Sequence, residues 1–130
     1  MSELCNNPNK LAEKTAKLNL PNTKYHIFIC CDQTKENESK QCCSKADGLL
    51  AWDYLKNRLN ELNLTSKCGI QRTKANCLRI CTHGPIVVIY PQGVWYHSCM
   101  PEVLEQIIQS HIINGQILTE YVLPDIIENK

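Results

Sequence analysis

Apolar residues gather in short runs that predict strands. The runs at 25–30 and 85–90 are rich in β-branched and aromatic residues, so each predicts a buried strand. Pro91-Gln92-Gly93 is a turn sequence that joins the second run to Val94–His97, which predicts an antiparallel hairpin. A weaker strand is expected over about 67–72.

Helical spacing of apolar residues predicts two main helices. The first begins after Ser44, a residue type that caps helix N-termini, and runs to about Leu62. The second begins at Pro101, which suits the first position of a helix, and ends before Gly115. Residues 1–22 form an appendage, either with a short amphipathic helix over Leu11–Leu18 or as a frayed extension.

The order strand, helix, strand, hairpin, helix predicts the α/β class with a mixed sheet of four to five strands. Two main helices flank this sheet, and we expect them to cover its two faces. The 130 residues suffice for one buried core. We divide the chain into an N-terminal extension (1–22), one domain (23–115) and a C-terminal tail (116–130).

The charge balance excludes several classes of partner. There are 14 Lys+Arg and 13 Asp+Glu, a formal net charge of +1, whereas general binding to nucleic acids or membrane surfaces needs a large basic excess. No apolar run approaches the roughly 18 residues that span a bilayer. The N-terminus lacks the apolar segment of a secretory signal. The sequence therefore predicts a cytoplasmic protein that binds neither nucleic acid nor membrane.

Cysteine is the outlier of the composition, with nine residues. An odd count without an export signal argues against a disulfide framework, because thiols stay reduced in the cytosol. Six of the nine fall in three close pairs, which are Cys30/Cys31, Cys42/Cys43 and Cys77/Cys81. Thiolates are soft ligands that select zinc, copper(I) or iron–sulfur clusters, so this clustering indicates a metal site. The absence of any Cys-x2-Cys motif disfavours a zinc knuckle and a thioredoxin-type dithiol.

The spacing that remains suits two irons. Cys30 and Cys42 form a wide pair, whereas Cys77 and Cys81 form a tight Cys-x3-Cys pair. A 2Fe–2S core needs two thiolates on each iron, and two loops that each supply a pair meet that need.

Longer motifs surround these cysteines: HIFIC (His26–Cys30), NCLRICTHGP (Asn76–Pro85), and VVIYPQGVWYHS (Val87–Ser98) followed by PEVLEQI (Pro101–Ile107). They resemble the thioredoxin-like 2Fe–2S ferredoxins over about residues 24–115. This family is also similar to the cluster domain of the small flavoprotein-arm subunit of respiratory complex I. The resemblance implies a thioredoxin-like fold, one surface-proximal 2Fe–2S cluster, and one-electron transfer without catalytic residues. It also implies redox protein partners, a reductase or an electron-accepting enzyme, and a homodimer.

Position by position, the resemblance places the cluster ligands at Cys30, Cys42, Cys77 and Cys81. The doubled cysteines leave an alternative in the first loop, because a one-residue slip would make Cys31 or Cys43 the ligand. The remaining cysteines are expected to be ordinary small apolar residues. These are Cys5, Cys68 and Cys99.

Other interpretations of the cysteines stay open at this stage. The same cluster could serve a redox-sensing or accessory module, and zinc could stabilise a thioredoxin-like domain without redox function. A Rieske-type site, in which two histidines replace two cysteines, is a further alternative. Basic residues near the ligand loops form either a solvated rim or a docking face for an acidic partner. They are Lys35, Lys40, Lys45, Arg72, Lys74 and Arg79.

Overall fold

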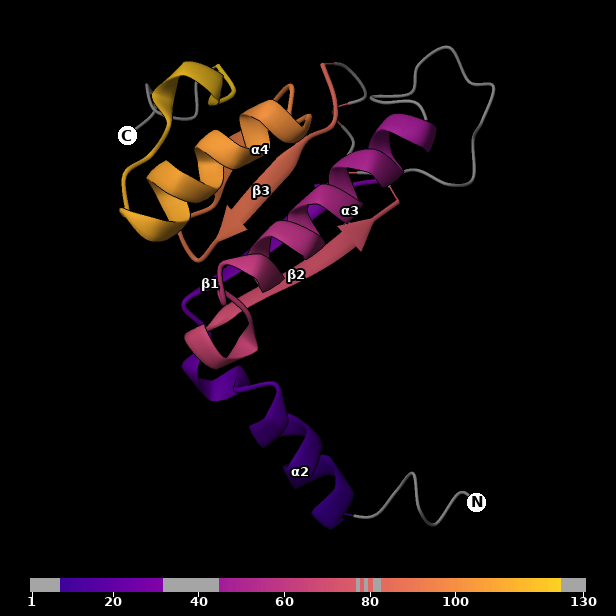
Figure 1. Ribbon diagram of the computed structural model, residues 1–130, viewed down its shortest axis with the longest axis vertical. Coiled ribbons are helices and arrows are strands. Elements are labelled where there is room, and N and C mark those ends of the chain that lie inside the picture. The colour runs from indigo at the N-terminus through magenta and orange to yellow at the C-terminus, as the bar shows by residue number, and fades with distance from the viewer. Residues whose placement is uncertain (1–7, 32–44, 77, 79, 81–82, 125–130) are drawn as a thin grey trace.

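Four strands form one mixed sheet in a computed structural model that describes residues 8–31, 45–76, 78, 80 and 83–124 (Figure 1). The strands are β1 (Tyr25–Cys30), β2 (Ile70–Ala75), β3 (Val87–Tyr90) and β4 (Val94–Tyr96), in the spatial order β2-β1-β3-β4. β1 pairs in parallel with β2 and antiparallel with β3, and β3 and β4 form the predicted hairpin. The predicted mixed α/β sheet is therefore confirmed.

β2 begins later than the sequence pattern suggested. Residues Ser66–Cys68 form a 3₁₀ turn, η2, in which the Cys68 N–H donates to the Thr65 carbonyl at 2.8 Å. Gly69 follows with a φ of 81°, a left-handed conformation that interrupts extended backbone. The strand therefore starts only at Ile70.

The helices agree closely with the predicted ones. α3 spans Lys45–Glu61, and α4 spans Pro101–Ile107 and continues as a π-helical turn, η3 (Ile108–Ile113). α2 spans Pro8–Lys17, so the N-terminal residues described here include a helix. Two further 3₁₀ turns are η1 (Leu20–Asn22) and η4 (Thr119–Tyr121). The predicted cap, Ser44, lies outside the described residues. None of the helices in the described ranges is long and apolar enough to cross a membrane.

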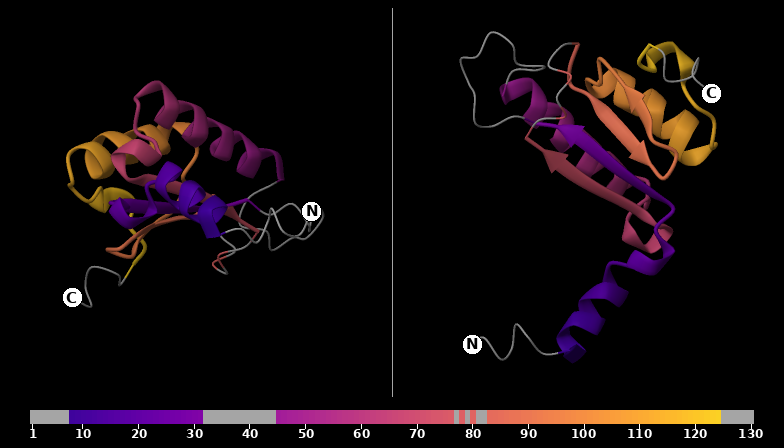
Figure 2. Two further views of the ribbon diagram at one scale, coloured as in Figure 1. Left: turned by 90° about the horizontal axis from the view of Figure 1, so that it is seen from below. Right: turned by 180° about the vertical axis from the view of Figure 1, so that it is seen from behind.

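α3 and α4 lie on the same face of the sheet (Figure 2), so the expectation that they cover opposite faces is wrong. Leu55 of α3, Leu104 of α4 and Ile27 of β1 share one apolar core. Glu105 of α4 also accepts hydrogen bonds from Arg58 of α3, at 2.8 Å from Nε and 3.1 Å from Nη2. These bonds from the guanidinium lower the pKa of Glu105 to about 2.

α3 and α4 leave the opposite side of the sheet uncovered (Figure 2). His26 and Phe28 of β1 alternate with the core residues Ile27 and Ile29, so they lie on this side. His26 and Phe28 stack with ring centroids 4.2 Å apart, and Phe28 contacts Tyr90 edge-on at 6.1 Å. Tyr90 is 44% exposed, and Trp95 is half-buried. We call this surface, made of His26, Phe28, Tyr90 and Trp95, the open sheet face.

A buried histidine links η3 to the sheet. His111 Nδ1 lies 2.7 Å from the Tyr96 hydroxyl, and Nε2 contacts Gln92 Oε1. Because an amide oxygen only accepts, Nε2 carries the proton and Nδ1 accepts from Tyr96. The Tyr96 oxygen in turn accepts the Leu118 N–H at 3.1 Å. The neutral form of the His111 ring thus makes both of its hydrogen bonds. Burial lowers the pKa of His111 from its ordinary value of 6.5, which also favours this neutral form.

Acid is expected to destabilise the fold through His111. Because the pKa of His111 is lowered in the folded chain, the unfolded chain binds the proton first as the pH falls. The free energy of unfolding should therefore be flat above pH 6.5 and decrease below it, by at most about 1.4 kcal/mol per pH unit for one group. His26 adds to this loss, since burial lowers its pKa too, whereas Glu105 adds only below its ordinary value of 4.5.

Urea unfolding at pH 7.5 and 5.5 measures this dependence. His111→Gln should be less stable at pH 7.5 but should lose less stability between the two pH values. Equal losses in the two chains would show that His111 is not the titrating group.

Candidate metal centre

Several elements bring their ends to one edge of the sheet. β1 and β2 are parallel, so their carboxyl ends lie side by side, with Cys30 opposite Ala75. α3 begins at this same edge, and β3, antiparallel to β1, starts there too (Figures 1 and 2). Along the chain, residues 32–44 connect β1 to α3, and residues 76–86 connect β2 to β3. Both segments that carry predicted ligands therefore start and finish at this edge, which we call the ligand edge.

Cys30 and Cys31 are the two ligand candidates that the structure describes. Their side chains are 0% and 1% exposed. The Cys30 N–H donates to the Ile86 carbonyl at 2.9 Å, and the Cys31 N–H donates to the Ala75 carbonyl at 2.6 Å. Backbone hydrogen bonds to the last residue of β2 and to the residue before β3 thus fix the end of β1. The other candidates lie outside the described residues and are Cys42, Cys43, Cys77 and Cys81.

Apolar side chains surround the Cys30 thiol. Cys30 and Ile86 form a buried cluster separate from the main core, and partly buried apolar residues pack against it. These are Leu78, Trp95 and Leu123. Such a shell limits access of water to a metal held by Cys30, and solvent access is one of the factors that set a reduction potential.

The segment before β3 is tied to the end of β4. His83 adopts a φ of 54°, and the Gly84–Pro85 bond is cis. The Ser98 N–H donates to the His83 carbonyl at 2.7 Å, and the Cys99 N–H donates to the Pro85 carbonyl at 2.9 Å. The chain is therefore anchored from two residues after Cys81 onward.

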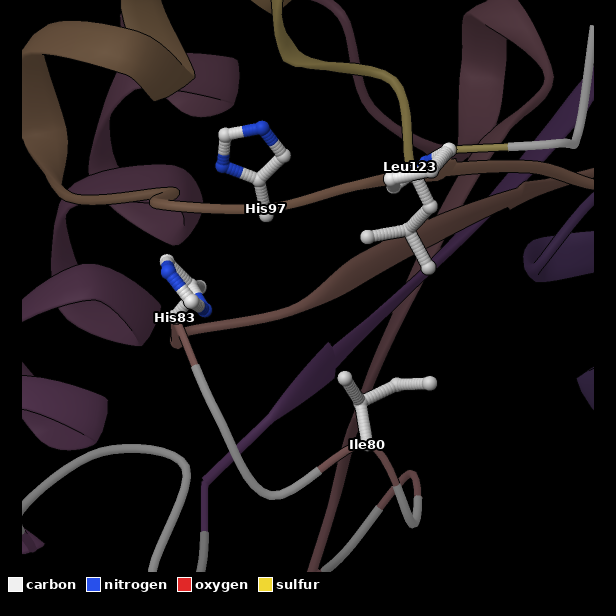
Figure 3. A pocket seen from close by; sticks show the side chains of 5 residues that line it. Ile80, His83, His97 and Leu123 are labelled. Atoms are coloured by element: carbon white, nitrogen blue, oxygen red, sulfur yellow. The ribbon is translucent and has the colours of Figure 1, made fainter.

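A cavity of about 490 Å³ lies beside this segment (Figure 3). Its lining consists of Ile80, His83, His97, Leu123 and Pro124. The rings of His83 and His97 meet edge-on, with centroids 6.2 Å apart. This cavity was not predicted from the sequence, because Leu123 reaches it through a contact with the edge of β4, where the Leu123 N–H donates to the Trp95 carbonyl at 3.0 Å. The sequence signal for that contact is the short apolar stretch from Ile117 to Leu123 in the tail.

His111 is engaged through both ring nitrogens, which disfavours it as a ligand of a Rieske-type site. His111 binds Tyr96 and Gln92, and His26 Nε2 lies 2.8 Å from the Thr73 hydroxyl. His97 Nδ1 lies 2.8 Å from the Ser98 hydroxyl. Within the described residues, no group of three or more His, Cys, Asp or Glu side chains is placed to hold a metal ion.

Comparison with known proteins identifies several similar chains. The sequence is 33% identical over 97 residues to "Ferredoxin, 2Fe-2S" of Clostridium pasteurianum, covering 75% of this chain and 93% of that protein. It is 25% identical over 101 residues to "Ferredoxin, 2Fe-2S" of Aquifex aeolicus, covering 75% and 87%. No protein-family model matches the chain.

Solved structures show a similar fold. The wild-type thioredoxin-like [2Fe-2S] ferredoxin from Aquifex aeolicus superposes with a TM-score of 0.67 at 24% identity, over 79% of this chain and 99% of that one. A cysteine-to-serine variant of the same protein gives a TM-score of 0.69 at 22% identity, over 78% and 99%. About a fifth of this chain thus lies outside the matched region.

Proposed function

This chain belongs to the thioredoxin-like 2Fe–2S ferredoxins, and from that premise we propose that it carries single electrons between redox proteins on one 2Fe–2S cluster. The observation that carries this conclusion is the 33% identity across 93% of the Clostridium pasteurianum ferredoxin. The thioredoxin-like fold agrees with it, because the two chain segments that contain Cys42/Cys43 and Cys77/Cys81 both connect to the described elements at the ligand edge.

We propose that the cluster ligands are Cys30, Cys42, Cys77 and Cys81. The described part of the site fits such a group: β1 holds a buried soft donor at the ligand edge, within an apolar shell. Cys31 and Cys43 stay as alternatives, since each adjoins a proposed ligand. When bound, the cluster supplies reversible one-electron chemistry, and the protein sets its potential, its exposure and its partner.

The fold also offsets the negative charge of such a centre. Four cysteinates around the iron–sulfur core carry a net charge of about −2 when oxidised and about −3 when reduced. α3 has 17 residues, and its N-terminus, the positive end of the helix dipole, lies at the ligand edge (Figure 1).

The same proposal covers the rest of the chain. Residues 23–115 form the ferredoxin domain, 1–22 an N-terminal extension and 116–130 a tail, part of which bridges to β4 at Val122. The chain has no catalytic residues of its own and exchanges electrons with a reductase or an electron-accepting enzyme. We place it in the cytoplasm, because that compartment keeps thiols reduced and the chain contains nine cysteines.

Absorption and EPR spectra of anaerobically purified protein, before and after dithionite, test this function. We expect visible bands that bleach on reduction, together with a rhombic S = 1/2 signal. A colourless protein that holds zinc, or nothing even after cluster reconstitution, would contradict the proposal.

We also propose that two copies of the chain pair through the open sheet face. Helices cover the other side of the sheet, whereas this side presents Phe28 in contact with Tyr90 and, beyond Val88, Trp95. Aromatic residues are enriched at interfaces because they bury large apolar areas.

Phe28→Asp is expected to convert the dimer to a monomer, since it places a charge at the centre of this face. The dissociation constant should rise by about tenfold or more, as for other central interface aromatics. Sedimentation velocity measures the change, and Leu50→Asp is the control, because Leu50 is 53% exposed on α3. A wild-type chain that sediments as a monomer would refute the dimer.

A further inference from the structure

We propose that Trp52, Arg72 and Lys74 form a cationic docking site for surface carboxylates of an acidic redox partner. The inference rests on the proposed electron-carrier function and adds the chemistry of the partner's contact surface. We call these three residues the Trp52 site.

The Trp52 ring holds two cations in place. Trp52 lies on α3 and packs against the main core. The Arg72 guanidinium lies 5.8 Å from the centroid of its ring, and the Lys74 ammonium lies 6.0 Å from it. Arg72 and Lys74 are two residues apart on β2, so their side chains project from the same face of the strand. Cation–π attraction to a partly desolvated ring therefore orders two side chains that would otherwise be mobile.

Neither cation is compensated within the described part of the chain. The ion pairs there join Lys56 to Asp53 and Arg58 to Glu61 and Glu105, and none involves Arg72 or Lys74. In the same described residues, Arg72 Nε is buried and has no hydrogen-bond partner. An acidic partner would supply the negative charge that the described part of the chain does not place beside these two residues.

The Trp52 site lies beside the ligand edge. Lys74 pairs with Ile29 in the sheet, and the residue after Ile29 is Cys30. Lys74 also precedes Cys77 by three residues along the chain. A partner anchored at this end of β2 is thus held next to the proposed centre, which is what rapid electron exchange requires.

The chemistry of the patch favours a protein partner over other anions. Nucleic acids and anionic membranes need many cations, whereas the chain as a whole carries a formal net charge of +1. Two cations on an aromatic platform match a small group of carboxylates.

Binding of a hexaglutamate peptide tests the site without using the cluster. Titration into the purified chain should change tryptophan fluorescence, and Arg72→Gln/Lys74→Gln should weaken binding by about fourfold or more at about 0.1 M salt. Lys14→Gln/Lys17→Gln is the matched control, because it removes the same charge from exposed positions on α2. Equal weakening in the two variants, or none in either, would overturn the site.

Electron exchange gives a second readout. Hexacyanoferrate(III) takes one electron from the dithionite-reduced chain and becomes hexacyanoferrate(II). This reaction should slow about fourfold in Arg72→Gln/Lys74→Gln, whereas oxidation by the cation hexaamminecobalt(III) should not slow. Unchanged rates with intact visible bands would overturn the docking site alone. Absent visible bands in the unmodified chain would instead contradict the proposed function, and the peptide titration would still decide the docking site.

Discussion

Cys30→Ser is expected to remove most of the visible absorption of the purified protein, whereas Cys31→Ser should retain it. Substitution of a residue that only supports a metal ligand lowers metal affinity by about 10- to 100-fold. Loss of a ligand itself should therefore lower cluster content by at least that much. The two cysteines control for each other, since both side chains are buried and both backbone N–H groups are hydrogen-bonded. A loss of packing alone would affect them alike.

Iron and acid-labile sulfide per chain, measured with the visible spectrum, give the result. Circular dichroism shows whether each variant is folded. A colourless Cys31→Ser beside a coloured Cys30→Ser would assign the ligand to Cys31. Full cluster content in both variants would show that the end of β1 provides no ligand. The same comparison applies to Cys42 and Cys43.

The sequence predicted most elements of the fold because their patterns are local. The run at 25–30 and the hairpin around Pro91 are determined by β-branched residues and turn chemistry, and both were found. The start of β2 was misplaced, since a single left-handed residue, Gly69, ends the preceding turn. An apolar stripe shows which side of a helix is buried, yet it does not show which face of the sheet the helix meets. For that reason the shared face of α3 and α4 was missed.

The candidate site could be predicted only in part, for a similar reason. The close spacing of the cysteines is a local signal, and the structure places Cys30 at the end of a strand as expected. Contacts between distant segments leave no comparable signal. The cavity joins His83 to Leu123, and the Trp52 site joins α3 to β2. Three-dimensional packing was needed to bring these residues together.

Gly69→Ala is expected to cause a large loss of stability at the end of the sheet opposite the ligand edge. A β-carbon at Gly69 would lie 2.6 Å from the Asn22 carbonyl oxygen and 3.0 Å from the Lys24 nitrogen, both backbone atoms that cannot rotate away. The φ of 81° adds the strain of a left-handed alanine. Moreover, the Gly69 carbonyl accepts the Lys24 and Tyr25 N–H groups at 2.7 and 3.0 Å, so a shift of this backbone disturbs the entry to β1. Together these effects should cost about 2–4 kcal/mol.

Gly115→Ala separates the two causes. Gly115 has a similar φ of 71°, but a β-carbon there meets nothing within 4 Å. This variant should therefore lose only about 1 kcal/mol, the cost of the left-handed conformation. Urea unfolding at pH 7.5 measures both losses, and equal losses would mean that backbone conformation, not the close contact, sets the cost at Gly69. Because Gly69 lies at the other end of β2 from Ala75, the folded Gly69→Ala protein should keep its visible spectrum. A changed visible spectrum in a fully folded Gly69→Ala protein would show instead that the two ends of the sheet are coupled.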